Sequence, residues 1–136
     1  MRLKKDESMK RLLIRVAIAA AAAVACNAIL RTVVRRVAHV PDGFDPFTWP
    51  PIIVATLVGV AGGTIVYLAL RSLLRERAVR VFTWVGAIVL VLSLITPITL
   101  LWSHPPQYPG TSVIAVFALE LMHVSTAVAT IVALTL

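Results

Sequence analysis

The chain has 136 residues, of which 60% are hydrophobic and 14% charged, and its mean hydropathy is +0.94. These values lie on the membrane side of the globular range and the length allows one domain, so we expect a single transmembrane domain over residues 1–136. The net charge of +7 does not indicate a nucleic-acid partner, because Lys and Arg flank the apolar stretches, where they act as topology signals and contact the anionic head groups of a lipid bilayer.

Four apolar stretches fill most of the sequence, and a soluble domain of this length could not hide all of them from water. A helix needs about 20 mostly apolar residues to cross the hydrocarbon core of a bilayer. The stretches therefore predict an all-α fold, a four-helix transmembrane bundle with short loops. The predicted spans are residues 12–37, 51–70, 81–102 and 112–136.

The first predicted span follows a basic head and contains Cys26, the only cysteine, which excludes an internal disulfide. The head and the Ala-rich stretch resemble a secretory signal, and residues 23–26 approximate a lipoprotein cleavage box. Leu usually stands three residues before that cysteine, but this chain has Ala23 there. We therefore expect a retained helix in which Cys26 is a small buried apolar side chain.

Two proline-rich loops, residues 39–50 and 103–110, are predicted to follow the first and third spans. His39 and His104 are interpreted as solvated interfacial residues. Three aromatic residues at the end of the first loop fit the aromatic belt of a membrane interface: Phe44, Phe47 and Trp49.

The second span carries small residues at a spacing of four, namely Ala55, Gly59 and Gly63. Such a stripe allows two helices to approach closely. The spacing does not decide whether the partner helix belongs to this chain or to another one. In the third span, Pro97 is expected to kink the helix or to free a backbone carbonyl.

Basic residues determine the predicted orientation. The head contributes five Lys and Arg and the short loop at residues 71–80 contributes four, nine in total. The opposite side has three, Arg31, Arg35 and Arg36. The positive-inside rule therefore predicts a multi-pass protein of the plasma (inner) membrane with both termini in the cytoplasm.

Five polar residues inside the spans are candidate ligand-binding residues. Glu120 is the one carboxylate within a span, and His123 follows three residues later on the same helical face. The predicted topology brings Asn27, Arg31 and Thr96 to the same half of the membrane. A charged group in mid-membrane costs about 2.5–3.5 kcal/mol on insertion scales, so we expect Glu120 to face protein with a partner.

Two interpretations of this cluster stay open. In the first, Glu120 pairs with Arg31 or Asn27 and joins the first helix to the fourth. In the second, the cluster is a pocket for a lipid-like or quinone-like ligand, or a proton-active site. Glu120 and His123 also match half of a helical di-metal site, but no second such pair exists in the spans. No metal, cofactor or catalytic residue is expected.

Short motifs along nearly the whole chain carry a resemblance to a known group. They are Asn27 near the end of the first span, Phe44-x-Pro46, Arg80-x-Phe82, Ser93-Leu94 followed by Pro97, and Met122-His123-Val124. In layout and motifs the chain resembles small four-helix integral membrane proteins of bacteria that are grouped as a domain of unknown function. The resemblance implies a fold and no mechanism.

The expected function is non-enzymatic, because four membrane spans leave almost no extramembrane surface for chemistry. We expect an accessory or scaffold subunit of a larger membrane complex, with other membrane protein chains as partners. The alternative is a membrane protein that binds a lipid-like or quinone-like ligand, or a small enzyme, built around a polar pocket of Asn27, Arg31, Glu120 and His123.

Thiol labelling in intact cells tests the predicted orientation. In a Cys26→Ala background, Ser8→Cys is expected to resist an impermeant thiol reagent and Ser103→Cys is expected to react, because only the second would face the outside. The opposite labelling pattern would reverse the orientation.

Overall fold

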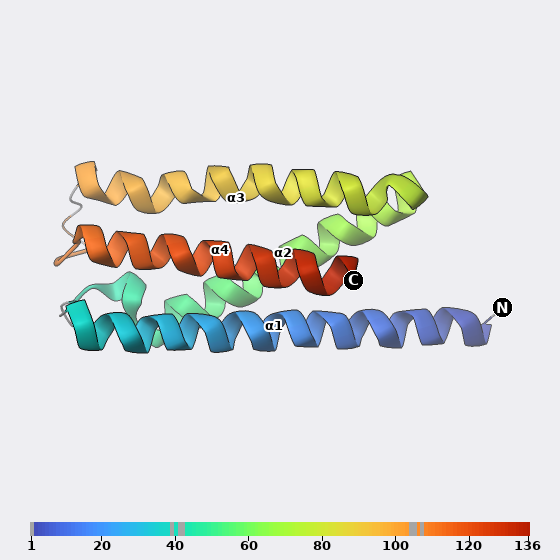
Figure 1. Ribbon diagram of the computed structural model, residues 1–136, viewed down its shortest axis with the longest axis horizontal. Helices are drawn as coiled ribbons and strands as arrows, with labels where there is room; N and C mark the ends of the chain where they lie inside the picture. Colours follow the sequence, from blue (N-terminus) through green and yellow to red (C-terminus); the bar gives the residue numbers. More distant parts are fainter. Residues whose placement is uncertain (1, 39, 41–42, 104–105, 107) are drawn as a thin grey trace.

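A computed structural model provides the structure, which describes residues 2–38, 40, 43–103, 106 and 108–136, with side chains from Ser8 onward. His39 and His104 lie outside the described residues. Four long helices account for most of the fold: α1 (Arg2–Ala38), α2 (Trp49–Leu74), α3 (Ala78–Ser103) and α4 (Val113–Thr135). Two short 3-10 turns, η1 (Asp45–Phe47) and η2 (Arg75–Arg77), complete it. The expected all-α class is confirmed (Figure 1).

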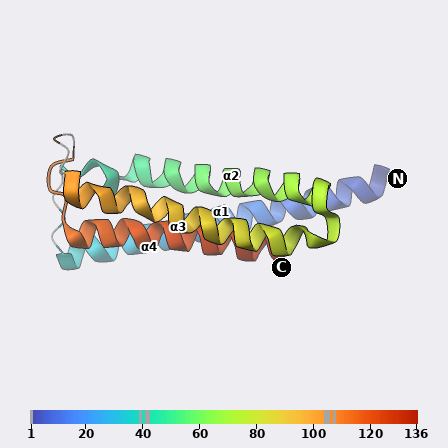
Figure 2. The same ribbon diagram turned by 90° about the horizontal axis from the view of Figure 1, so that it is seen from above.

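Three continuous helical stretches of the described chain are long and apolar enough to cross a membrane. They are Ser8–Ala38, Trp49–Ser103 and Val113–Thr135. The middle stretch has 55 residues because η2 joins α2 to α3 without an intervening loop. It bends sharply there, with Arg75 in the left-handed region at φ 46°, and α3 returns beside α2 (Figure 2). These stretches indicate a multi-pass membrane protein.

The first helix is longer than the predicted span, since α1 begins at Arg2 rather than near Leu12. The head is rich in Lys, Arg, Leu and Met, which are good helix formers, so the helix continues through it. The start of α1 extends past the end of α4 (Figure 1). Among the described side chains of α1, which start at Ser8, Leu12 is the first buried one, and it packs with Tyr67, Phe82 and Leu134.

Helix α4 packs against all three other long helices, and its most extensive contact is with α1. The Ala-rich stretch of α1 lies along it: Ala19 and Ala23 are fully buried, with Ala129 and Ala133 of α4 against the same cluster. Alanine side chains add little bulk, so the two backbones approach closely. One face of the Ala-rich stretch thus packs on α4, whereas its other face is exposed and includes Cys26, so the prediction that Cys26 is buried is wrong.

The small residues of α2 also face α4. A Cβ on Gly63 would lie 2.8 Å from Thr130 Cγ2, and one on Gly59 would lie 3.1 Å from Thr126 Cγ2. Both glycines therefore lie close against α4, although Gly59, like Ala55, is exposed on its other side. The small-residue stripe is at least partly used within this chain.

The aromatic belt prediction is wrong for two of its three residues. Phe44 and Phe47 are fully buried, in a cluster with Ile52, Ala115 and Met122 among others. Both rings therefore lie in the hydrophobic interior near the loop end of the fold and not at its surface.

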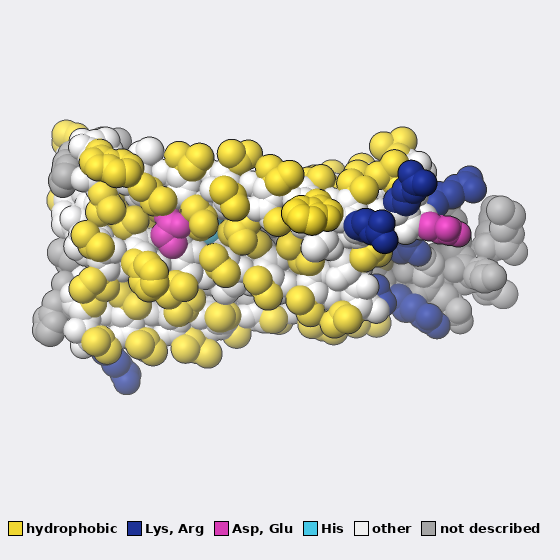
Figure 3. Space-filling view, turned by 45° about the horizontal axis from the view of Figure 1, so that its top comes forward, with side chains coloured by type: hydrophobic (Ala, Val, Ile, Leu, Met, Phe, Trp, Pro, Cys, Tyr) yellow, Lys and Arg dark blue, Asp and Glu magenta, His cyan; other side chains and the backbone are white. Residues whose placement is uncertain are grey.

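The surface of the described residues separates charge from apolar area. Hydrophobic side chains cover most of the face seen in Figure 3, and most of the Lys and Arg side chains visible there gather at the end where η2 lies. The described cations at this end are exposed at Lys10, Arg11, Arg71, Arg75, Arg77 and Arg80.

Candidate functional site

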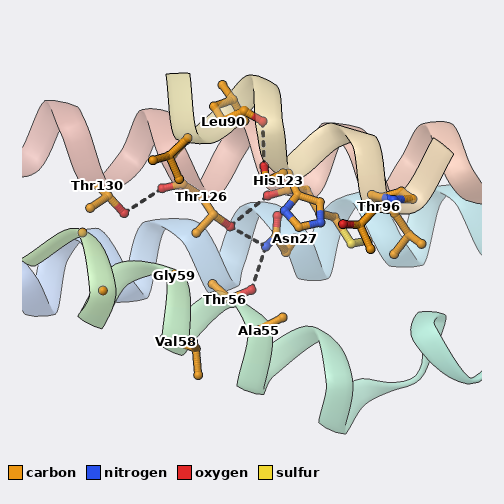
Figure 4. A pocket seen from close by; sticks show the side chains of 18 of the residues that line it. Asn27, Ala55, Thr56, Val58, Gly59, Leu90, Thr96, His123, Thr126 and Thr130 are labelled. Carbon is orange, nitrogen blue, oxygen red and sulfur yellow. Dashed lines mark hydrogen bonds between the residues drawn. The ribbon is translucent and has the colours of Figure 1, made fainter. Parts of the chain in front are cut away.

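Asn27 is the centre of a hydrogen-bond network that joins three helices. Its side chain is 1% exposed. The amide nitrogen Nδ2 donates to Thr56 Oγ1 of α2 at 2.8 Å and to Thr126 Oγ1 of α4 at 3.1 Å. The amide oxygen Oδ1 accepts from Ser125 Oγ of α4. A single side chain of α1 therefore holds α2 and α4 together in the apolar interior (Figure 4).

The threonine hydroxyl protons determine which way the Asn27 amide points. Thr56 Oγ1 donates to the carbonyl of Ile52 at 2.7 Å. Thr126 Oγ1 donates to the carbonyl of Met122 at 2.8 Å. Because a hydroxyl has one proton, both threonines can only accept from Asn27. The two N–H groups of the amide are the matching donors, so little of its capacity is left for a ligand.

Arg31 binds the loop end of the bundle. Its Nε donates to the carbonyl of Phe47 at 2.9 Å, and its guanidinium carbon lies 4.1 Å from the ring centroid of Trp49. The second contact is a cation–π interaction. Arg31 thus connects the end of α1 to η1 and to the start of α2.

The predicted pairing of Glu120 with Asn27 or Arg31 is wrong. Glu120 Oε1 is buried and has no hydrogen-bond partner among the described residues. Both expected partners are already engaged, Asn27 by three hydroxyl groups and Arg31 by Phe47 and Trp49. Asn27, not Glu120, joins the first helix to the fourth.

Helix geometry indicates what Glu120 faces instead. It precedes Ile131 by eleven residues, about three helical turns, so the two share a face of α4. Ile131 packs on α3, where a Cβ on Gly86 would lie 2.8 Å from its Cδ1. Because this face of α4 packs on α3, which runs antiparallel to it (Figure 1), Glu120 lies on the side of α4 that is turned toward α3.

An apolar, partly open groove of about 750 Å³ is lined by residues of α2, α3 and α4. Its volume lies in the range of pockets that hold one small molecule. Three of the five predicted ligand-binding residues line it: Asn27, Thr96 and His123. Arg31 and Glu120 do not. The sequence-based cluster is therefore divided between the groove, the loop end and the α3–α4 contact.

Thr96 and His123 supply polar groups that the protein leaves unused. Neither side chain forms a hydrogen bond with another described residue. The imidazole lies between Asn27 and Thr96 in the close view of the groove (Figure 4). The Thr96 hydroxyl can donate one hydrogen bond, and a neutral imidazole offers one donor and one acceptor nitrogen.

Metal binding receives no support from the geometry of the described residues, among which no three His, Cys, Asp or Glu side chains gather. Hydrogen bonding to a polar group within an apolar ligand is what the arrangement can do chemically.

Sequence reasoning missed two residues of the Asn27 network and understated a third. Ser125 and Thr126 are adjacent on α4, and Thr56 lies on α2. Hydroxyl residues are common in membrane helices and often bond to their own backbone carbonyls, so type alone does not distinguish them. The sequence feature that could have predicted the network is Asn27 itself. Its amide lies in an apolar stretch and therefore needs several hydrogen-bond partners within the protein.

One protein-family model, described as a family of unknown function (DUF6069), matches residues 7–136. No curated protein and no solved structure matches the chain.

Asn27→Leu is expected to destabilise the bundle by roughly 2 kcal/mol, because it removes three interhelical hydrogen bonds of about 0.6 kcal/mol each. Unfolding in detergent measures this change. Thr32→Val is the matched control, since Thr32 is exposed and its hydroxyl bonds only to the carbonyl of Ala28 in its own helix. An Asn27→Leu protein as stable as the control would contradict the network.

Glu120→Leu is expected to have the opposite effect and to stabilise the protein by about 1–3 kcal/mol. The substitution removes a buried oxygen without a hydrogen-bond partner and keeps a side chain of similar length. The same unfolding measurement applies. A loss of stability would show that the carboxyl group has a partner after all.

Proposed function

The chain belongs to the DUF6069 family of unknown function, since the family model covers nearly all of it, and we propose that it is a non-enzymatic membrane protein that binds a lipid-like molecule. The proposed binding site is the groove between α2, α3 and α4. The observation that carries the proposal is that Thr96 and His123, which line a mostly apolar groove, have side chains without a hydrogen bond to another described residue. Unsatisfied polar groups away from water are costly, and a ligand with a polar group would satisfy them.

The proposed setting is a bacterial inner membrane crossed four times. Helices α2 and α3 have 26 residues each, about 39 Å at 1.5 Å per residue, which is enough for each to cross separately. The cations around η2 and at the start of α1 support a cytoplasmic location for that end of the bundle and for both termini. The same cations suit anionic lipid head groups.

A second candidate function is that of an accessory or scaffold subunit. Gly62 supports it, because a Cβ at this groove-lining position would meet no atom within 4 Å. A glycine with open space beside it allows close approach of a helix from another chain. In this case the groove would hold a partner helix rather than a lipid-like molecule.

Gly62→Phe is expected to lower the amount of co-purifying lipid-like molecule by about tenfold or more, because Gly62 lines the groove, has open space at its Cβ position, and a ring there would occupy ligand volume. Mass spectrometry of molecules retained by the protein in mild detergent measures this loss. Ala61→Phe is the matched control, since Ala61 is the exposed neighbour in α2 and does not line the groove.

Two results would contradict the proposal. In one, the wild-type protein and Gly62→Phe would retain the same molecules in the same amounts. In the other, the wild-type protein would retain a second membrane chain that Gly62→Phe releases, which would favour the accessory-subunit function.

A further inference from the structure

We infer that the ligand is a neutral quinone-type amphiphile, with a carbonyl-bearing ring and one apolar chain, rather than a phospholipid or a prenyl phosphate. The inference rests on the proposed function and concerns the chemistry of the same groove. It combines the absence of lining charge with the position of the unused donors.

The lining of the groove is uncharged. Among the described residues that line it there is no Lys, Arg, Asp or Glu. A phosphate head group inside the groove would lose hydration without gaining a cation or a cluster of backbone donors, which is expensive in an apolar medium. Arg80 is the described cation nearest in sequence to a lining residue, Phe82, but it lies at the η2 end of the groove, away from Thr96. Arg31, four residues after Asn27, has its Nε bonded to Phe47 and its guanidinium stacked on Trp49. A neutral head group avoids this cost.

The donors available to a ligand are neutral as well. The protons of Thr56 and Thr126 go to carbonyls of their own helices, and both N–H groups of Asn27 go to these threonines. The remaining groups are the Thr96 hydroxyl of α3 and the His123 imidazole of α4, which lie near one another, and the Tyr108 hydroxyl, which also lines the groove. Two neutral donors match an acceptor such as a ring carbonyl.

The rest of the groove suits a single apolar chain. Between Thr96 and Phe82 its α3 wall presents Ser93, whose hydroxyl bonds to Leu90 of the same helix, and otherwise apolar side chains and Gly86. These fourteen residues correspond to roughly 21 Å at 1.5 Å per residue. On the opposite wall, α2 offers glycines and Val66. A head group bound at Thr96 would leave its chain lying along this apolar path toward the η2 end.

Binding of two probes to the purified full-length chain in detergent tests the inference. Decylubiquinone has a dicarbonyl ring and one alkyl chain, and farnesyl phosphate has one prenyl chain and an anionic head group. Each probe is titrated against the protein, and the bound fraction is quantified after gel filtration. We expect saturable binding of decylubiquinone and no saturable binding of farnesyl phosphate.

The variant Thr96→Val/His123→Phe is expected to raise the Kd for decylubiquinone about tenfold or more, because it removes both donors and keeps the groove apolar. Thr99→Val is the matched control, since the exposed hydroxyl of Thr99 bonds to its own helix and does not line the groove. Unchanged elution volume and helical content establish that each variant is folded. If the double variant fails to fold, Thr96→Val alone is measured, with a severalfold rise in Kd expected.

The outcomes distinguish failure of the neutral head group from failure of the proposed lipid-binding function. Tight binding of farnesyl phosphate without binding of decylubiquinone, blocked by Gly62→Phe, would overturn the neutral head group and leave the groove as a lipid site. Equal affinity of wild type and the Thr96→Val/His123→Phe variant for decylubiquinone would also overturn the head-group assignment. Binding of neither probe, together with no effect of Gly62→Phe on retained molecules, would overturn the proposed function itself.

Discussion

A polar group in the interior of a membrane bundle must find its partners within the protein, because water is not available to replace them. The Asn27 amide meets this requirement with three hydroxyl groups from two other helices. Hydrogen bonds have strict distance limits, so the network determines how far α1, α2 and α4 are displaced along one another. The groove depends on this arrangement, since Asn27, Thr56 and Thr126 are part of its lining.

Packing by small residues completes the arrangement that hydrogen bonding begins. Ala19 and Ala23 bring α1 onto α4, while Gly59 and Gly63 bring α2 against the threonines of α4. Close approach on these faces leaves the facing sides of α2 and α3 less filled, and the groove is the space that remains there. The same absence of water explains why Thr96 and His123 stand out, since their polar atoms have no described partner.

Hydropathy was sufficient to predict the helices, because four long apolar stretches have few alternatives to crossing a bilayer. The partners of Asn27 were not predictable, since Ser125, Thr126 and several other hydroxyl residues are equivalent by type and only the rotation of α4 distinguishes them. Glu120 was assigned to Asn27 or Arg31 on cost alone, but hydroxyls and a loop carbonyl satisfy those residues first. Phe44 and Phe47 were assigned to the interface because spacing cannot reveal that η1 folds back.

The turn η2 holds α2 and α3 at a fixed distance from each other at one end of the groove. It joins α2 to α3 without a loop, so any change in the angle between the two helices would be centred on this turn. Each helix is 26 residues long, about 39 Å. A change of about 5° in the angle between them would move their far ends apart by roughly 3 Å, whereas the spacing beside the turn would hardly change. Small changes in bilayer thickness or in the packing of Pro97 would therefore alter the width of the groove mainly near Thr96, away from the turn.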